Sequence, residues 1–158
     1  THLVLAGPEM PNFRAACDPS GSVPRSPWER GARIHQLGVL TEPQKRDFFA
    51  GIDVFALPSR SDSFGLVLLE AWANQKPVVA YRAGGPADIV RHESDGLLAP
   101  CGDVVTLAAA LHRLCESAEL RAQLAAAGHA RTGAEFRWRD KLELVRATYQ
   151  QKLASDAK

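Results

Sequence analysis

The stretch VFALPSRSDSFGLVLLEAWANQKP, residues Val54–Pro77, decides the fold of this chain. Its apolar run Val54–Leu57 reads as a strand that stops at a proline, and a short polar loop, Ser59–Ser63, follows. The next segment, Phe64–Asn74, reads as a helix that the final proline ends. A strand, a loop and a helix N-terminus in this order place unpaired backbone N–H groups around an anion.

Two carboxylates flank this segment eight positions apart, Asp62 in the loop and Glu70 on the helix. Carboxylates suit sugar and ribose hydroxyls because they accept hydrogen bonds from O–H donors. An anion site beside two hydroxyl acceptors predicts a nucleotide-sugar as the ligand. Each residue keeps an ordinary alternative, since Asp62 could only form a turn and Glu70 could be a surface helix residue.

Strands and helices are expected to alternate along the chain. The expected strands are His2–Ala6, Ile34–Leu37, Val54–Leu57, Pro77–Ala80 and Gly96–Ala99. They are apolar on both sides, which predicts an α/β fold: a Rossmann-like, doubly wound parallel sheet with helices on both faces and a helical C-terminal segment. Ligands bind beyond the carboxyl ends of such strands. Three loops lie at that edge: Gly38–Thr41, Pro58–Gly65 and Arg82–Pro86.

Local signals define the expected helices. Thr41, Asp103 and Ser117 are expected to cap three of them, and Gly128 is expected to break the last of these. Segment 8–33 reads mostly as loop with a helical turn near Asn12–Cys17. The final helix carries an apolar stripe of Trp138, Leu142, Val145 and Tyr149. One domain is expected over residues 1–154, followed by a frayed tail, 155–158.

Composition excludes several classes of protein. The 158 residues are 46% hydrophobic and 23% charged with a net charge of +1, so no electrostatic footprint for nucleic acid is expected. Three cysteines without CxxC spacing argue against a disulfide framework and for a reducing compartment. Five arginines in the first third are either solvated loop charges or a patch facing anionic lipid or a second domain: Arg14, Arg25, Arg30, Arg33 and Arg46.

The chain resembles the C-terminal half of a family-4 retaining glycosyltransferase, an enzyme of the two-domain GT-B architecture. The resemblance covers most of residues 34–150 and rests on a set of matches taken together. These are Pro58-Ser59, Asp62, Phe64-Gly65, Glu70-Ala71, Ala73, Pro77-Val78-Val79-Ala80, Gly84-Gly85, Asp88-Ile89-Val90, Gly96-Leu97-Leu98 and Phe136-Arg137-Trp138.

The resemblance implies a transferase, of the hexosyltransferase type, that moves a sugar from a nucleoside-diphosphate-sugar to an acceptor. It implies that Glu70 holds the ribose hydroxyls and Asp62 the hydroxyls of the donor sugar. The backbone of Phe64, Gly65, Leu66 and Val67 would meet the sugar and diphosphate, and Gly38 and Val39 would line the base. Ser59, Gly84 and Gly85 complete the implied donor site. No metal or other cofactor is expected, because a helix N-terminus offsets the diphosphate charge.

Three departures from the family pattern matter. Asp62 stands where the family has Glu, which shortens the reach by about 1.5 Å, and Asn74-Gln75-Lys76 replaces a small residue and a glycine. The strand with a Gly-Arg and Lys-Gly pair, expected before His2, and the N-terminal acceptor-binding domain are absent from the sequence. The chain alone is therefore expected to be inactive. The intact enzyme is expected in the cytoplasm, with peripheral contact at the inner membrane.

Other classes remain open. A binding-only Rossmann-like module is the main alternative, supported by Asp62 and the missing half, and another nucleotide-sugar protein such as an epimerase is a third. The serines of the loop lack the GxSxG elbow of a serine hydrolase, and no GxGxxG follows the first strand. The five histidines lack a metal-binding spacing such as HExxH.

Overall fold

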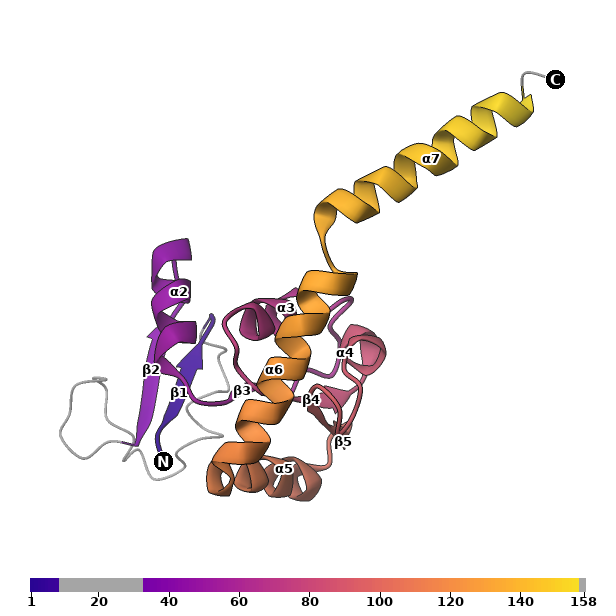
Figure 1. The fold of residues 1–158 in the computed structure, drawn as a ribbon. Helices are drawn as coiled ribbons and strands as arrows, with labels where there is room; N and C mark the ends of the chain where they lie inside the picture. The colour runs from indigo at the N-terminus through magenta and orange to yellow at the C-terminus, as the bar shows by residue number, and fades with distance from the viewer. Residues whose placement is uncertain (9–32, 157–158) are drawn as a thin grey trace. The chain divides into compact units, whose positions relative to one another are not determined.

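The structure is a computed structural model, and it describes residues 1–8 and 33–156 (Figure 1). The chain divides into two compact units, Thr1–Ile52 and Asp53–Lys158, and each is described by itself. The helical turn expected near Asn12–Cys17, and Arg14, Arg25 and Arg30, lie outside the described residues. The single domain expected over 1–154 stays a prediction.

The first unit contains a parallel pair of strands and a helix. Strand β1 (Leu3–Ala6) pairs with β2 (Ile34–Gly38), with Leu3 opposite Ile34. Helix α2 (Glu42–Gly51) begins after Thr41, whose backbone N–H donates to the Gln44 side chain at 2.9 Å. This confirms the predicted helix start, because the bond satisfies a backbone group that the helix itself leaves unpaired.

The second unit is built on a three-stranded parallel sheet. Its strands are β3 (Phe55–Leu57), β4 (Val78–Arg82) and β5 (Leu97–Pro100), in the spatial order β3-β4-β5. In the register, Val78 lies opposite Phe55 and Val79 lies opposite Leu97. The parallel α/β class predicted from the alternation of apolar strands and helices is confirmed, and strands β4 and β5 end slightly later than expected.

Five helices flank this sheet or follow it: α3 (Leu66–Ala73), α4 (Gly84–Ile89), α5 (Val104–Glu116), α6 (Ala118–Glu135) and α7 (Trp138–Asp156). Two predicted caps are confirmed. The Asp103 carboxylate accepts the backbone N–H of Thr106 at 3.0 Å, and Ser117 Oγ accepts that of Leu120 at 3.1 Å. The hydrogen bonds from Thr106 lower the pKa of Asp103, as expected of a charged helix cap.

The core of this unit lies between the sheet and helices α5 and α6. It contains Val79 and Leu97 from the sheet with Ala110, Leu114 and Leu124 from the helices, and all five are buried. The spacing of Ala110 and Leu114 by four residues puts both on one face of α5, which is why this helix packs against the strands.

Among the described residues Trp72 is the largest fully buried side chain, and it explains an error in the sequence prediction. Gly128 does not break α6, which is continuous over Ala118–Glu135. A Cβ atom at Gly128 would lie 2.2 Å from Cδ1 of the Trp72 indole. The glycine is therefore a point of close approach between α6 and α3. Its helix-propensity cost of about 1 kcal/mol is offset by the packing of a buried tryptophan.

Two glycine variants in α6 should change stability in opposite directions. Gly128→Ala should lower the free energy of unfolding by about 1–3 kcal/mol, because the methyl group overpacks against Trp72. Gly133→Ala, in the same helix, meets no atom within 4 Å and should raise it by up to about 1 kcal/mol. Urea unfolding of both variants measures the difference, and equal effects of the same sign would refute the proposed packing.

Helix α7 carries the predicted apolar stripe, but the stripe is exposed. Trp138, Leu142, Val145 and Tyr149 are each about half exposed or more, as are Leu144 and Leu153. The helix itself is confirmed and continues to Asp156, two residues beyond the expected end of the domain at residue 154.

The outer edge of β5 is closed by the chain itself. The turn before the strand carries His92, and the backbone N–H of Leu98 donates to its Nδ1 at 2.9 Å. Pro100, at the end of the strand, has no N–H to offer. Two positions at which a further strand could pair are therefore unable to donate a ladder hydrogen bond.

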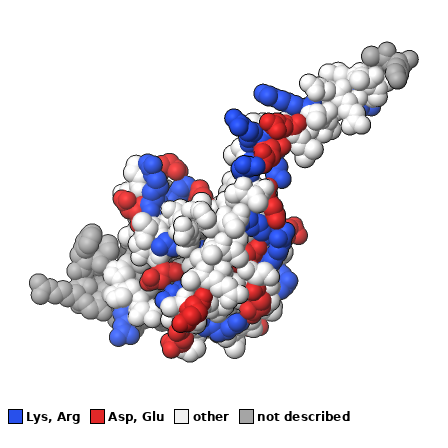
Figure 2. Space-filling model, in the orientation of Figure 1, with Lys and Arg blue, Asp and Glu red and all other residues white. Residues whose placement is uncertain are grey.

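Positive and negative side chains are interspersed on the visible face of the second unit (Figure 2). Within residues 1–8 and 33–156, no helix is long and apolar enough to cross a membrane.

Candidate functional site

The loop between β3 and α3 is held by the side chain of Asp62. Its Oδ1 accepts the backbone N–H groups of Phe64 at 3.0 Å and of Gly65 at 2.6 Å. A short aspartate bonding to the backbone two and three residues ahead is typical of an Asx turn. The turn-forming alternative for Asp62 is therefore realised in the structure, and two of the four backbone amides predicted to meet the donor are already bonded to it.

A pair of glycines locks this loop against α4. The N–H of Gly85 donates to the backbone carbonyl of Asp62 at 2.8 Å. A Cβ atom at Gly84 would lie 2.4 Å from that carbonyl oxygen, and one at Gly85 would lie 2.3 Å from Cα of Phe64. Real Cβ atoms do not approach backbone this closely, so any side chain at Gly85 would displace the loop. The structure shows the packing of these glycines against the loop, and their contact with a ligand stays a prediction.

Helix α3 begins directly after this loop and presents the predicted anion site. The amides of Leu66 and Val67, the first two of the helix, make no hydrogen bond within the described part of the chain. The N–H of Leu68 already donates to Gly65 O at 2.9 Å. Unpaired N–H groups at a helix start, together with the helix dipole, favour a negatively charged ligand.

The other predicted donor residues of the second unit lie around the same helix. Glu70 is half-buried on α3, about one turn after the start of the helix at Leu66. Ser59 is half-buried at the start of the loop, and Phe64 and Leu66 are exposed. Trp72 belongs to the core: its Nε1 donates to the Asp95 carbonyl at 3.0 Å.

Gly38 and Val39, the predicted base-lining residues, belong to the first unit. Gly38 ends β2 with a φ of 67°, and its carbonyl accepts the N–H of Gly7 at 2.8 Å. Val39 is exposed. His35, also on β2, stacks on His2 with ring centroids 5.2 Å apart. These residues form part of a strand pair in their own unit, and their role toward a base stays a prediction.

Sequence reasoning missed a buried ion pair, Asp95–Arg131, that lies beside Trp72 on the core side of α3. The carboxylate of Asp95 accepts Nη1 of Arg131 at 2.7 Å and the backbone N–H of Arg91 at 2.8 Å. The same Nη1 donates to the backbone carbonyl of Ile89. The Arg131 guanidinium also lies 5.8 Å from the centre of the Trp72 ring. This group joins α6, the turn before β5 and the core side of α3.

An exposed carboxylate completes this group. Glu135 accepts Nε of Arg131 at 2.8 Å and Nη2 of Arg91 at 3.1 Å. The hydrogen bond from Arg131 lowers the pKa of Glu135 below its ordinary value. The local sequence does not predict the ion pair between Asp95 and Arg131. Asp95-Gly96 reads as a turn, and Arg131 lies 36 positions further along the chain.

Metal ligation finds no support among the described residues, since no three His, Cys, Asp or Glu side chains gather there in a way that could hold an ion. Cys101 and Cys115 are free and exposed, and Cys17 lies outside the described residues.

A parallel α/β unit with an amide-lined loop and helix start after one of its strands defines a Rossmann-like ligand-binding domain. The chain belongs to the family described as Glycosyl transferases group 1, whose model matches residues 28–131. The predicted relation to GT-B glycosyltransferases is confirmed, and the prediction of a C-terminal domain is consistent with the matches.

Two curated relatives illustrate the match. The chain is 36% identical over 110 residues to the lipopolysaccharide core biosynthesis glycosyltransferase LpsD of Rhizobium meliloti, covering 70% of this chain and 28% of that protein. It is 34% identical over 160 residues to the D-inositol 3-phosphate glycosyltransferase of Mycobacterium marinum, covering 94% and 34%. The chain thus spans about a third of the length of these relatives.

Solved structures show the same fold. Sucrose-phosphate synthase from Thermosynechococcus elongatus matches 98% of this chain and 39% of its own, with a TM-score of 0.81 and 26% identity. HepE of Anabaena, solved in complex with UDP, matches 98% of this chain and 41% of its own, with a TM-score of 0.73 and 25% identity. The C-terminal domain of the group 1 protein LpcC from Francisella tularensis has the same fold, with a TM-score of 0.63 and 23% identity. It matches 68% of this chain and 56% of its own.

Proposed function

We propose that this chain is the donor-binding half of a retaining glycosyltransferase that moves a hexosyl group from a nucleoside-diphosphate-sugar to an acceptor. The observation that carries the proposal is the start of α3, where the amides of Leu66 and Val67 have no partner in the described part of the chain. Glu70 lies on the same helix, one turn further on. An anion on these amides would place a hydroxyl-bearing group within reach of its carboxylate.

Each predicted residue has a role in this proposal. The diphosphate lies on the α3 N-terminus, Glu70 accepts the ribose hydroxyls, and Asp62 faces the donor sugar. Only Oδ1 of Asp62 bonds to the loop amides, which leaves Oδ2 as an acceptor for a hydroxyl. The positive end of the helix dipole stabilises the leaving diphosphate without a metal ion. Gly38 and Val39 line the base, and Ser59 adds a hydroxyl to the donor site.

The acceptor would be held by a second half of the enzyme. The matches cover only 28% and 34% of these two curated relatives, which leaves room in them for an acceptor-binding domain. Transfer needs both walls of a cleft to position the reactants and exclude water. The chain alone should therefore bind a donor weakly and transfer no sugar. We place the intact enzyme in the cytoplasm, in contact with the inner membrane at its surface.

A binding-only module is the second candidate, and one observation favours it. Oδ1 of Asp62 is already bonded to two loop amides, so the shorter side chain reaches less far toward a sugar than a glutamate would. An assay of sugar transfer by a protein that joins this chain to an acceptor-binding half separates the two candidates. Donor binding without any turnover would favour the binding-only module.

Substitutions of the two carboxylates should have different effects on donor affinity. Calorimetry with UDP, GDP and ADP and with their glucose derivatives first identifies the nucleotide. Glu70→Ala should then weaken both the nucleotide and the nucleotide-sugar by about 1.5–3 kcal/mol, because a charged acceptor of the ribose hydroxyls is lost. Asp62→Asn keeps an oxygen for the loop amides and should weaken only the nucleotide-sugar.

The exposed Asp88 on α4 provides the matched control, and Asp88→Asn should change neither affinity. Asp62→Glu restores the side-chain length of the family and should retain binding. If Glu70→Ala leaves the nucleotide affinity unchanged, the ribose assignment is wrong. If Asp62→Asn weakens the bare nucleotide as much as the nucleotide-sugar, Asp62 holds the loop rather than the sugar.

A further inference from the structure

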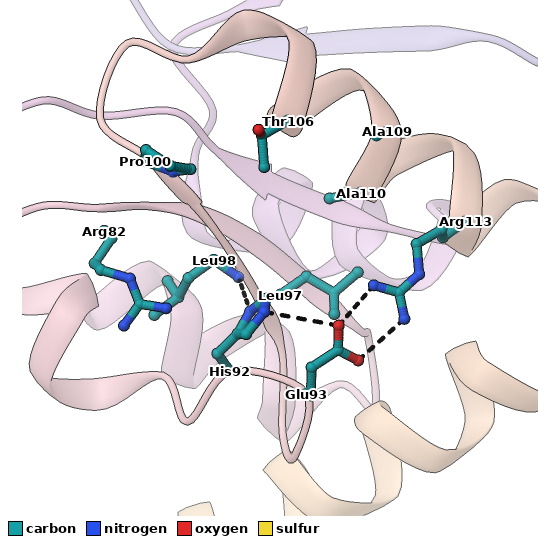
Figure 3. A pocket seen from close by; sticks show the side chains of 10 residues that line it. All are labelled: Arg82, His92, Glu93, Leu97, Leu98, Pro100, Thr106, Ala109, Ala110 and Arg113. Atoms are coloured by element: carbon teal, nitrogen blue, oxygen red, sulfur yellow. Dashed lines mark hydrogen bonds and ion pairs between the residues drawn. The ribbon is translucent and has the colours of Figure 1, made fainter.

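The second unit contains a cavity of about 360 Å³ between β5, the turn that precedes it and α5 (Figure 3). None of the residues assigned to the donor lines it. Its walls come from Arg82 on β4, His92 and Glu93 in the turn, Leu97, Leu98 and Pro100 on β5, and Thr106, Ala109, Ala110 and Arg113 on α5. The volume lies at the lower end of the range of small-molecule sites, about 300–1,000 Å³.

An ion pair closes one end of this cavity. Arg113 Nη1 donates to Glu93 Oε1 at 2.6 Å and Nη2 to Oε2 at 3.0 Å, and both side chains are drawn in Figure 3. This paired geometry lowers the pKa of Glu93 through the hydrogen bond from Arg113, so the carboxylate is ionised near neutral pH. The two charges satisfy one another and contribute no net charge to the cavity.

The hydrogen bond to His92 fixes the tautomer of its ring. Nδ1 accepts the N–H of Leu98 at 2.9 Å and therefore carries no proton. In the neutral imidazole the hydrogen is then on Nε2, which lies 3.7 Å from Glu93 Oε1. His92 thus lines the cavity as a hydrogen-bond donor held in place by the strand.

Arg82 supplies the unbalanced charge. It is the last residue of β4, its side chain is exposed, and Figure 3 shows it extending toward the side of the cavity where Leu98 and His92 lie. Within the described residues the Arg82 side chain makes no hydrogen bond and no ion pair. A guanidinium without a partner binds carboxylate or phosphate oxygens through two parallel hydrogen bonds.

We propose that this cavity binds a small organic anion, with a carboxylate or phosphate-ester group on Arg82 and an apolar body on Leu97, Pro100 and Ala110. The charge of the walls favours this class, because Glu93 and Arg113 cancel and Arg82 remains. The lining favours a compact ligand with an apolar part, because the wall between the charged ends is mostly apolar and its one hydroxyl, Thr106 Oγ1, already donates to Asp103 Oδ2 at 2.6 Å. The lining includes no residue assigned to the proposed donor, although Arg82 lies two positions before Gly84 in the chain.

The test is an NMR titration of the isotope-labelled protein with benzoate, hexanoate, acetate and phenyl phosphate. Benzoate, hexanoate or phenyl phosphate should produce saturable shifts at the amides of Arg82, His92 and Leu98, and acetate should bind more weakly because it lacks the apolar body. Arg82→Ala should weaken binding roughly tenfold, the loss expected for a charge-assisted hydrogen bond. Arg139→Ala, which removes an exposed arginine on α7, should leave binding unchanged.

Neutral benzyl alcohol distinguishes an anion site from an apolar one, and it should shift these amides little. The proposal is overturned if no anion saturates these shifts, if Arg82→Ala binds as well as the unaltered protein, or if benzyl alcohol binds as tightly as benzoate. A stronger response to phenyl phosphate than to benzoate would identify phosphate esters as the natural class, and the reverse would identify carboxylates. Glu70→Ala should have no effect here, which keeps this test distinct from that of the donor site.

Discussion

Replacing Arg131 with alanine should lower the free energy of unfolding by roughly 3–5 kcal/mol, the cost of breaking a buried ion pair by removing one partner. The side chains of Arg131 and Asp95 are only 11% and 3% exposed, and they meet at 2.7 Å. The variant leaves the Asp95 carboxylate buried with no cation beside it. It also removes the guanidinium from the Trp72 ring and from the Ile89 carbonyl. Urea unfolding followed by tryptophan fluorescence measures the loss.

A second contact of Arg131, with Glu135, provides a control variant. The Nε of Arg131 donates to Glu135, whose side chain is 41% exposed, so Glu135→Ala removes a contact of Arg131 while keeping the buried pair. Exposed pairs contribute little, and this variant should lose no more than about 1 kcal/mol. Similar losses for Arg131→Ala and Glu135→Ala would show that the buried pair with Asp95 is not what stabilises this region.

Gly85→Ala should disrupt the proposed donor site more than any exposed substitution in the loop. The new Cβ would lie 2.3–2.5 Å from the backbone of Phe64, so the loop must move and the bond from Gly85 N–H to the Asp62 carbonyl must weaken. A displacement of about 1 Å at a catalytic loop can cost a hundredfold in rate. We expect sugar transfer by the intact enzyme to fall by about that factor, with a loss of about 1–3 kcal/mol in stability from overpacking.

Two measurements separate the local effect from general unfolding. Circular dichroism should show that Gly85→Ala keeps its helices at 20 °C while donor binding by calorimetry is weakened. Gly133→Ala also adds a methyl group to a helical glycine, but in open space, and should bind donor normally. Normal binding by Gly85→Ala would mean that the loop position does not determine donor affinity.

The order of elements could be predicted from the sequence because each rests on local signals. The apolar runs before Pro58 and after Pro77 became β3 and β4, and Asp103 and Ser117 cap the helices that they were expected to cap. Helix α3 was predicted from Phe64 but starts at Leu66, because the Asp62 turn holds Phe64 and Gly65 in the loop. These signals act over three or four residues, within the range of a hydrogen bond along the chain.

Contacts between distant residues could not be predicted in this way. Gly128 resembled a helix break because its partner, Trp72, is 56 positions earlier, and the Asp95–Arg131 pair has no local signature. The assignment of Asp62 falls between these cases. The sequence allowed both a turn and a sugar contact, and the structure shows the turn, while the sugar contact is still to be tested.

The closed edge of β5 has a consequence for how this protein tolerates partial unfolding. A bare strand edge is a template on which other chains can add strands and grow into ordered aggregates. Here the backbone N–H of Leu98 is already bonded to the His92 ring, and Pro100 has no N–H to donate. Another chain could therefore pair with this edge of β5 only after the bond between His92 and Leu98 is broken. His92→Ala should therefore shorten the lag time of fibril formation under mildly destabilising conditions, even though the fold itself is retained. His92 would thus protect the edge of β5 from pairing with strands of other chains.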